Sequence, residues 1–310
     1  MNIWKFILEK LKNGHRVVLM VVIDHYGSSP GRKGFKMAVA EDGELLGSIG
    51  GGVMEYRLTE QARKLFSTPR QPYIKRQDHQ AKNTEDSSGL ACSGSQVIAF
   101  YLLDNTFLPI IEQLSEAGSG ELIYNETGIR FDITTRGKDE TTITDDLHWY
   151  FSEHYGHRHF LYIFGAGHVS VAVSRLMYQL GFYVTVFDNR HEELATFKNN
   201  NFAHTKKIID YKNAADVVPE GDHVYVAIMT FAHKNDMQVL EQLLDKKIKY
   251  LGMMGSDDKV GSVFSELENR GIPRHKLDRV DAPIGLPIHS QTPDEIAVSI
   301  AAKIIQVKNG

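Results

Sequence analysis

A glycine turn between an apolar run and a helical pattern is the part of this sequence best suited to binding chemistry. Residues 160–164 are apolar and of strand length, and the turn GAGH that begins at Gly165 follows them. Gly167 has no Cβ to obstruct a pyrophosphate, and a helix beginning near His168 presents free N–H groups to such an anion. Ser170 stands where the usual fingerprint has a third glycine. The segment predicts the first half of a dinucleotide-binding βαβ unit.

Asp188 completes this pattern. It ends a second apolar run, 182–187, and lies 21 residues after Gly167. A carboxylate at that position can accept hydrogen bonds from a ribose, and its charge repels a 2′-phosphate. The sequence therefore favours NAD over NADP, although the nearby Arg190 leaves NADP open.

A second candidate for anion binding is the loop over 24–34 in the N-terminal half. Its glycines, serines and proline suit no regular element, and Arg32 and Lys33 make it cationic. Small residues that expose backbone N–H groups beside paired positive charges are typical of an anion-binding loop. The alternative is a solvated hairpin connection.

Three successive glycines, Gly50, Gly51 and Gly52, lie between a predicted strand and a predicted helix over 53–66. Here too the backbone can approach a ligand closely. Glu55 lies in the first turn of that helix, where it either stabilises the helix dipole or binds NH groups of a ligand.

Cys92 and His233 are the candidate reactive side chains. Cys92 lies among small residues in a glycine-containing turn, where free N–H groups can stabilise a thiolate; the alternative is an inert, buried thiol. His233 follows a buried strand at the edge where parallel strands place their ligands, and the alternative is a structural hydrogen bond. Four histidines within 148–159 have irregular spacing and no nearby cysteine, so we expect a polar linker there and no metal site.

Composition excludes several classes of protein. The chain has 310 residues, 42% of them hydrophobic, and a formal net charge of −4, which gives no electrostatic footprint for nucleic acid. No apolar stretch reaches membrane-spanning length, and the N-terminal residues form an amphipathic helix pattern instead of a secretory signal. With Cys92 as the single cysteine, no internal disulfide can form, and we expect a cytoplasmic protein.

The order of the predicted elements indicates two α/β domains. Residues 1–157 are expected to form an α+β domain, with a helix over 3–12, a buried strand at 17–23 and a long connection at 67–88. Residues 158–310 alternate strands and helices, which predicts a Rossmann-like, doubly wound parallel sheet.

Several motifs, in this order, resemble the XdhC/CoxI family of xanthine dehydrogenase accessory proteins. They are GSSPGRKGFKM (27–37), GSIGGGVME (47–55), GLACSGS (89–95), IFGAGHVS (163–170), TFAHKND (230–236), YLGMMGS (250–256) and APIGLPIHSQTPDEIAVSIAAKI (282–304). The resemblance covers nearly the whole chain, and the IGGG form of the second motif is similar to the XdhC branch.

This resemblance implies a maturation factor that binds molybdenum cofactor (molybdopterin), assists its sulfuration and delivers it to a xanthine dehydrogenase-type molybdenum hydroxylase. A cysteine desulfurase and a second copy of the chain are further implied partners. The phosphate of the pterin would suit the 27–36 loop or the Gly50–Gly52 turn, Cys92 would supply sulfur, and Glu55 would bind pterin NH groups. Three departures from the family pattern are Ser93 after the cysteine, Phe231 in place of a histidine and Ser170 in place of the third fingerprint glycine. The alternative function is an NAD(P)-dependent oxidoreductase with His233 as its acid–base residue.

Overall fold

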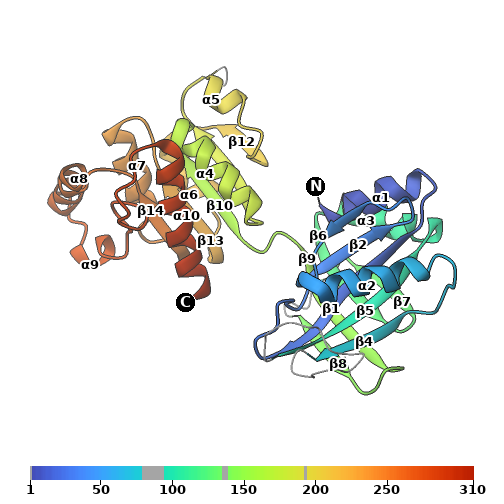
Figure 1. Cartoon of the computed structure of the whole chain (residues 1–310). Coiled ribbons are helices and arrows are strands. Elements are labelled where there is room, and N and C mark those ends of the chain that lie inside the picture. Colours follow the sequence, from blue (N-terminus) through green and yellow to red (C-terminus); the bar gives the residue numbers. More distant parts are fainter. Residues whose placement is uncertain (1, 79–93, 135–138, 192–193) are drawn as a thin grey trace. The chain divides into compact units, whose positions relative to one another are not determined.

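The structure is a computed structural model that describes residues 2–78, 94–134, 139–191 and 194–310. The chain divides into two compact units, residues 1–156 and 157–310, which Figure 1 shows in blue to green and in green to red. Within the described ranges, no helix is both long enough and apolar enough to cross a membrane.

A five-stranded antiparallel sheet with the order β3-β2-β1-β5-β4 forms the centre of the N-terminal unit. Its middle strand, β1, is buried over its first seven residues, as the β-branched run predicts. The strands are β1 (Val17–Tyr26), β2 (Lys36–Ala40), β3 (Leu45–Gly47), β4 (Tyr73–Asp78) and β5 (Ser95–Leu103).

Both faces of this sheet are covered. Helix α2 (Gly52–Lys64) packs on one face through Met54, Leu58 and Ala62. The other face packs against two helices and a second antiparallel sheet with the order β7-β6-β9-β8. These elements are α1 (Ile3–Lys12), α3 (Leu108–Ala117) with a preceding 3-10 turn (Asn105–Phe107), β6 (Ser119–Asn125), β7 (Gly128–Asp132), β8 (Glu140–Ile143) and β9 (Trp149–Gly156).

Two segments that the sequence predicted to be irregular contain strands. The connection at 67–88 includes β4, and the polar linker at 148–159 includes β9. Both predictions were wrong because these strands are held by pairing with β5 and β6, and polar residues such as Gln77 and Ser152 are buried in them. In β9 the inward side chains of Trp149 and Phe151 are almost fully buried.

The C-terminal unit is a Rossmann-like, doubly wound parallel sheet, as predicted. Its order is β12-β11-β10-β13-β14. Helices α4 and α10 cover one face, and α7 and α8 pack on the other (Figure 1). The strands are β10 (Phe160–Phe164), β11 (Tyr183–Asp188), β12 (Thr205–Ile208), β13 (Gly221–Ile228) and β14 (Ile248–Met253). The helices are α4 (His168–Gln179), α5 (Ala195–Lys198), a 3-10 turn (Tyr211–Asn213), α6 (Ala214–Val217), α7 (His233–Leu243), α8 (Asp257–Asn269), α9 (Arg274–Leu277) and α10 (Pro293–Asn309).

Local sequence explains where the main helices of this unit begin. Thr292 and Glu295 form a capping box at the start of α10, each side chain accepting a hydrogen bond from the other residue's backbone N–H. Ser256 caps α8 by accepting a hydrogen bond from the backbone N–H of Lys259. By contrast, no side chain caps α4 or α7, the helices that follow β10 and β13.

Candidate functional sites

Gln96, the second residue of β5, joins the two glycine segments of the N-terminal unit. Its side chain is buried; Oε1 accepts hydrogen bonds from Ser29 Oγ (2.9 Å) and Gly31 N (3.1 Å), and Nε2 donates to the carbonyl of Ile49 (3.1 Å). A Cβ on Gly31 would lie 2.3 Å from the Ile49 carbonyl oxygen, so only glycine allows this approach. Gln96 was not predicted from the sequence; its signal is a polar residue at the start of an apolar strand.

Glu55 binds the glycine turn from which its own helix begins. Its Oε2 accepts hydrogen bonds from Ser48 Oγ (2.7 Å), Ile49 N (2.8 Å) and Gly51 N (3.0 Å). The Glu55 carboxylate is thus directed at backbone N–H groups of the chain itself.

The cations of the 27–36 loop differ in their partners. Lys33 Nζ lies 3.5 Å from Asp24 Oδ1, and Lys36 forms a half-buried ion pair with Glu153 at 2.6 Å. Arg32 is exposed and pairs with no carboxylate of the described residues. Arg32 is thus the cation of this loop best placed to meet an anion from solution. Cys92 lies outside the described residues.

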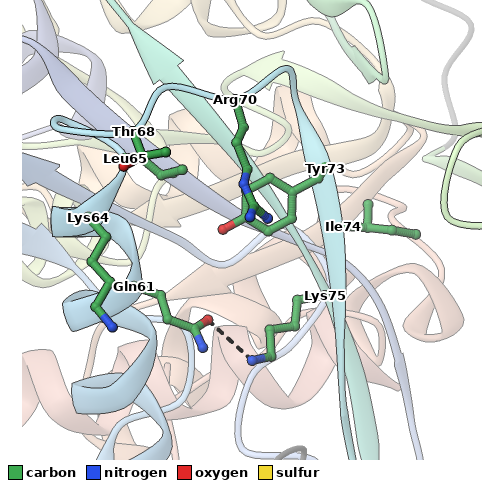
Figure 2. Close-up of a pocket in the computed structure, with 8 residues that line it drawn as sticks. All are labelled: Gln61, Lys64, Leu65, Thr68, Arg70, Tyr73, Ile74 and Lys75. Atoms are coloured by element: carbon green, nitrogen blue, oxygen red, sulfur yellow. Dashed lines mark hydrogen bonds between the residues drawn. The ribbon is translucent and has the colours of Figure 1, made fainter.

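A pocket of about 440 Å³ that was not predicted from the sequence lies between α2 and β4 (Figure 2). Its lining residues are Gln61, Lys64, Leu65, Thr68, Arg70, Tyr73, Ile74 and Lys75. The available signal was a basic run: between Glu60 and Asp78 the sequence contains lysines and arginines and no acidic residue.

In the C-terminal unit, the two glycines of the GAGH turn have different roles. Gly165 has a φ of 105°, and a Cβ there would lie 2.3 Å from the Met229 carbonyl oxygen, so this glycine allows the turn to pack against the end of β13. Gly167 precedes α4, and no atom lies within 4 Å of a Cβ built on it. The start of α4 therefore has open space and N–H groups without a side-chain cap, as an anion site requires.

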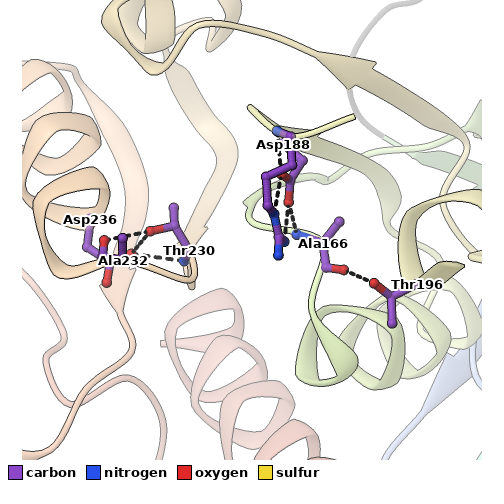
Figure 3. Close-up of polar contacts among 7 residues, drawn as sticks. Ala166, Asp188, Thr196, Thr230, Ala232 and Asp236 are labelled. Carbon is purple, nitrogen blue, oxygen red and sulfur yellow. Dashed lines mark hydrogen bonds and ion pairs between the residues drawn. The ribbon is translucent and has the colours of Figure 1, made fainter. Parts of the chain in front are cut away.

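Asp188 lies at the end of β11, as predicted, but its buried carboxylate is fully engaged within the protein. Ala166 N donates to Oδ2 (2.7 Å), which ties the GAGH turn to β11 (Figure 3). Arg190 donates three further hydrogen bonds, from its backbone N and Nε to Oδ1 (both 2.9 Å) and from Nη2 to Oδ2 (2.8 Å). Burial raises the pKa of Asp188, but the hydrogen bonds from Arg190 and Ala166 outweigh it and hold the pKa below its usual value.

Phe231 contributes to the same arrangement. The guanidinium of Arg190 lies over its ring, 4.8 Å from the centroid, and the ring is 64% exposed. Arg190 is therefore held between a carboxylate and an aromatic face at the carboxyl edge of the sheet. A ribose can reach Asp188 only by displacing Arg190, since a carboxylate has about four acceptor positions and all are used.

A second buried carboxylate fixes the neighbouring turn. Asp236, in the first turn of α7, accepts hydrogen bonds from Thr230 N (2.9 Å) and Thr230 Oγ1 (2.7 Å), as Figure 3 shows. Lys259 of α8 forms an ion pair with its other oxygen at 2.5 Å. His233 begins α7 and is half-buried, so the sheet brings it to the same edge as Gly165 and Asp188.

A cavity of about 410 Å³ adjoins the start of α4. It is lined by His168, Val171, Ala172, Arg175, Ala195, Thr196, Asn199, Phe202, Pro293 and Asp294. His168 is exposed at its rim, and Thr196 donates a hydrogen bond to the carbonyl of Ala166. A ligand bound through an anionic group at the start of α4 could therefore extend into this cavity.

These features define a two-unit α/β protein with a glycine turn before an uncapped helix on a Rossmann-type sheet. Residues 161–304 match the family model of the XdhC Rossmann domain, and residues 11–76 match that of the XdhC and CoxI family. The chain belongs to the XdhC family.

The chain is also similar to known proteins. The chain is 26% identical over 291 residues to the uncharacterized protein YqeB of Escherichia coli (strain K12), an alignment that covers 93% of this chain and 43% of that protein. It is 27% identical over 150 residues to a probable xanthine dehydrogenase subunit of Bacillus subtilis (strain 168), covering 48% of this chain and 42% of that protein. The chain thus spans less than half the length of these relatives. A crystal structure of a xanthine dehydrogenase from Bacillus halodurans matches 100% of this chain and 96% of that chain, with a TM-score of 0.72 and 25% identity.

Proposed function

We propose that this protein is an accessory factor that binds molybdenum cofactor and assists its sulfuration and insertion into a xanthine dehydrogenase-type molybdenum hydroxylase. The family membership supports a role linked to that class of enzyme. The observation that carries the proposal is the open, uncapped start of α4 beside Gly167, because molybdopterin carries a phosphate and needs such a place to bind.

The residues present fit such a ligand. The phosphate would bind the N–H groups at the start of α4, where Gly167 leaves room. The remainder would occupy the adjoining cavity, which lies within the size range of sites for small ligands. Arg190 adds a positive charge at the same sheet edge. When bound, the cofactor supplies the redox-active, dithiolene-bound metal; the chain's own residues bind, orient and shield it.

Cys92 completes the proposal as a thiolate ligand or sulfur carrier. Its neighbours Ala91, Ser93 and Gly94 offer little apolar surface to bury a thiol, and their N–H groups can stabilise a thiolate. The glycine turn held by Gln96 and the cation Arg32 are proposed as a separate anion site within the N-terminal unit.

The test is analysis of what co-purifies from a molybdate-replete host. We expect a pterin, identified by fluorescence after oxidation and by mass, in the wild-type protein. Gly167→Ala should lose it while remaining folded, because φ there is not positive and the new methyl group projects into the anion site. Gly261→Ala, at an equally open helical position in α8, is the matched control and should retain the pterin. Wild-type protein without pterin, or equal loss in both variants, would overturn the proposal.

The alternative, an NAD(P)-dependent oxidoreductase, is favoured by one observation: an acid at the end of β11 beside a glycine turn. Against it stands the complete engagement of Asp188 by Arg190 and Ala166. The same co-purification experiment separates the two functions, because NAD without pterin supports the oxidoreductase.

A further inference from the structure

The pocket between α2 and β4 collects positive charge from two elements. Tyr73 and Lys75 lie on the same face of β4, since side chains alternate along a strand, and Figure 2 shows Ile74 pointing away from them. Lys64, at the last position of α2, and Arg70, in the connection before β4, complete the cationic lining.

Among the described residues, Lys64, Arg70 and Lys75 form no ion pair with a carboxylate, and no acidic residue lines the pocket. By contrast, the neighbouring Arg63 pairs with Glu60 on the outer side of α2. Like charges around one pocket repel each other, and an anion bound among them relieves that repulsion. A cation at the carboxyl-terminal end of a helix interacts favourably with the helix dipole, which can explain Lys64 at the end of α2. It does not explain Arg70 and Lys75, because they lie outside the helix.

The neutral residues of the pocket suit a flat ring. The ring of Tyr73 stacks on Phe100 of β5, with centroids 4.8 Å apart and planes at 4°, so its orientation is fixed. Gln61 accepts a hydrogen bond from Lys75 Nζ at 3.2 Å, which leaves the amide nitrogen of Gln61 and further ammonium protons as donors. The volume of about 440 Å³ accommodates a ligand of nucleotide size.

We propose that this pocket is a second ligand site, which binds a small molecule made of a phosphate group joined to a flat heteroaromatic ring. Lys64, Arg70 and Lys75 bind the phosphate, and the ring lies against Tyr73. All the residues of this site belong to the N-terminal unit, whereas α4 belongs to the C-terminal unit.

Isothermal titration calorimetry of the full chain tests this with three probes: AMP, inorganic phosphate and adenosine. We expect AMP to bind more tightly than phosphate, and adenosine to bind weakly. Arg70→Gln and Lys75→Gln should each weaken AMP binding about tenfold or more, the scale of a lost charge-assisted hydrogen bond. Arg63→Gln removes the same charge one residue outside the lining and should leave binding unchanged. Circular dichroism establishes that each variant is folded.

The outcomes separate the parts of the proposal. If neither AMP nor phosphate binds the wild type, or if Arg63→Gln weakens binding as much as Arg70→Gln does, the site does not exist. If phosphate binds as tightly as AMP, the proposed contact between the ring of the ligand and Tyr73 is contradicted. Tyr73→Leu should reduce AMP affinity to that of phosphate, and an undiminished AMP affinity in this variant would also contradict the role of Tyr73.

Discussion

Arg190 donates three hydrogen bonds to the buried carboxylate of Asp188, and the N–H of Ala166 donates the fourth. An acid at the end of the second strand of a Rossmann sheet ordinarily faces a ribose. Here the same acid fixes the glycine turn on one side and an arginine on the other. Arg190 therefore controls access to Asp188, and it presents its own charge to whatever binds at this edge.

Replacing Arg190 tests this control. If NAD binds through Asp188, Arg190→Ala should raise NAD affinity, by about tenfold, because the ribose no longer competes with a charged hydrogen-bond donor. Calorimetry with NAD measures the change, and Asp188→Ala should remove the gain. A lower affinity for NAD, an anionic ligand, in Arg190→Ala would show instead that the arginine binds this ligand directly.

Gln96 should matter for stability more than its single side chain suggests. Gln96→Leu leaves the partners Ser29, Gly31 and Ile49 without their buried hydrogen bonds to this side chain, so we expect a loss of about 2 kcal/mol in the free energy of unfolding. Urea denaturation measures it. Gln113→Leu, on the exposed side of α3, is the control and should change little. Equal effects would contradict the role of Gln96.

Removing only one partner of the Asp236–Lys259 ion pair is expected to destabilise the folded protein. Lys259→Met leaves a fully buried carboxylate without its cation, and we expect a loss of about 3 kcal/mol in the free energy of unfolding. Lys276→Met provides the contrast, because Lys276 and Asp245 are also 2.5 Å apart but on the surface, where such a pair contributes less than about 1 kcal/mol. Similar losses in both variants would show that burial is not the deciding factor.

His159 should make stability fall on acidification. Burial, followed by the positive charges of Lys308 and Arg158, lowers the pKa of His159. The neutral ring is therefore favoured in the folded state. Its contribution to the free energy of unfolding is present above the unfolded pKa of about 6.5. It is lost as the pH falls further, because the unfolded chain then binds a proton that the folded chain resists.

Urea midpoints at pH 7.5 and 5.5 measure this dependence. His159→Phe, which can keep the ring contact with Phe182, should reduce the difference between the two midpoints. The exposed His275 supplies the control, and His275→Gln should leave the difference as it is in the wild type. An unchanged pH dependence in His159→Phe would assign the effect to other groups.

Replacing Cys92 tests whether its thiol has a chemical role or only a structural one. If it is a ligand or sulfur carrier, Cys92→Ser should keep the fold and abolish activation of a molybdenum hydroxylase in reconstitution. The wild-type thiol should also react with iodoacetamide at pH 7 faster than a free cysteine, whose pKa is about 8.5. Slow labelling together with full activation by the variant would return Cys92 to a structural role.

The sequence by itself determined the Rossmann half of this protein and the family to which it belongs. Apolar runs of strand length, helical periodicity and glycine turns such as Gly165–Gly167 are local signals, and each predicts its own element without reference to distant residues. The caps at Thr292 and Ser256 are local for the same reason. The strands β4 and β9 escaped prediction because they are recognisable mainly by the partner strands β5 and β6 that pair with them.

Tertiary structure alone decided how the candidate residues are used. That Arg190 turns to Asp188, and that Gln96 reaches Ser29 some 67 positions away, follows from packing between elements that sequence spacing does not encode. The pocket around Tyr73 likewise exists only because β4 pairs with β5 beside the end of α2. Hydrogen bonds and charges act over a few ångströms in space, so the partners of a side chain are fixed only when the chain has folded.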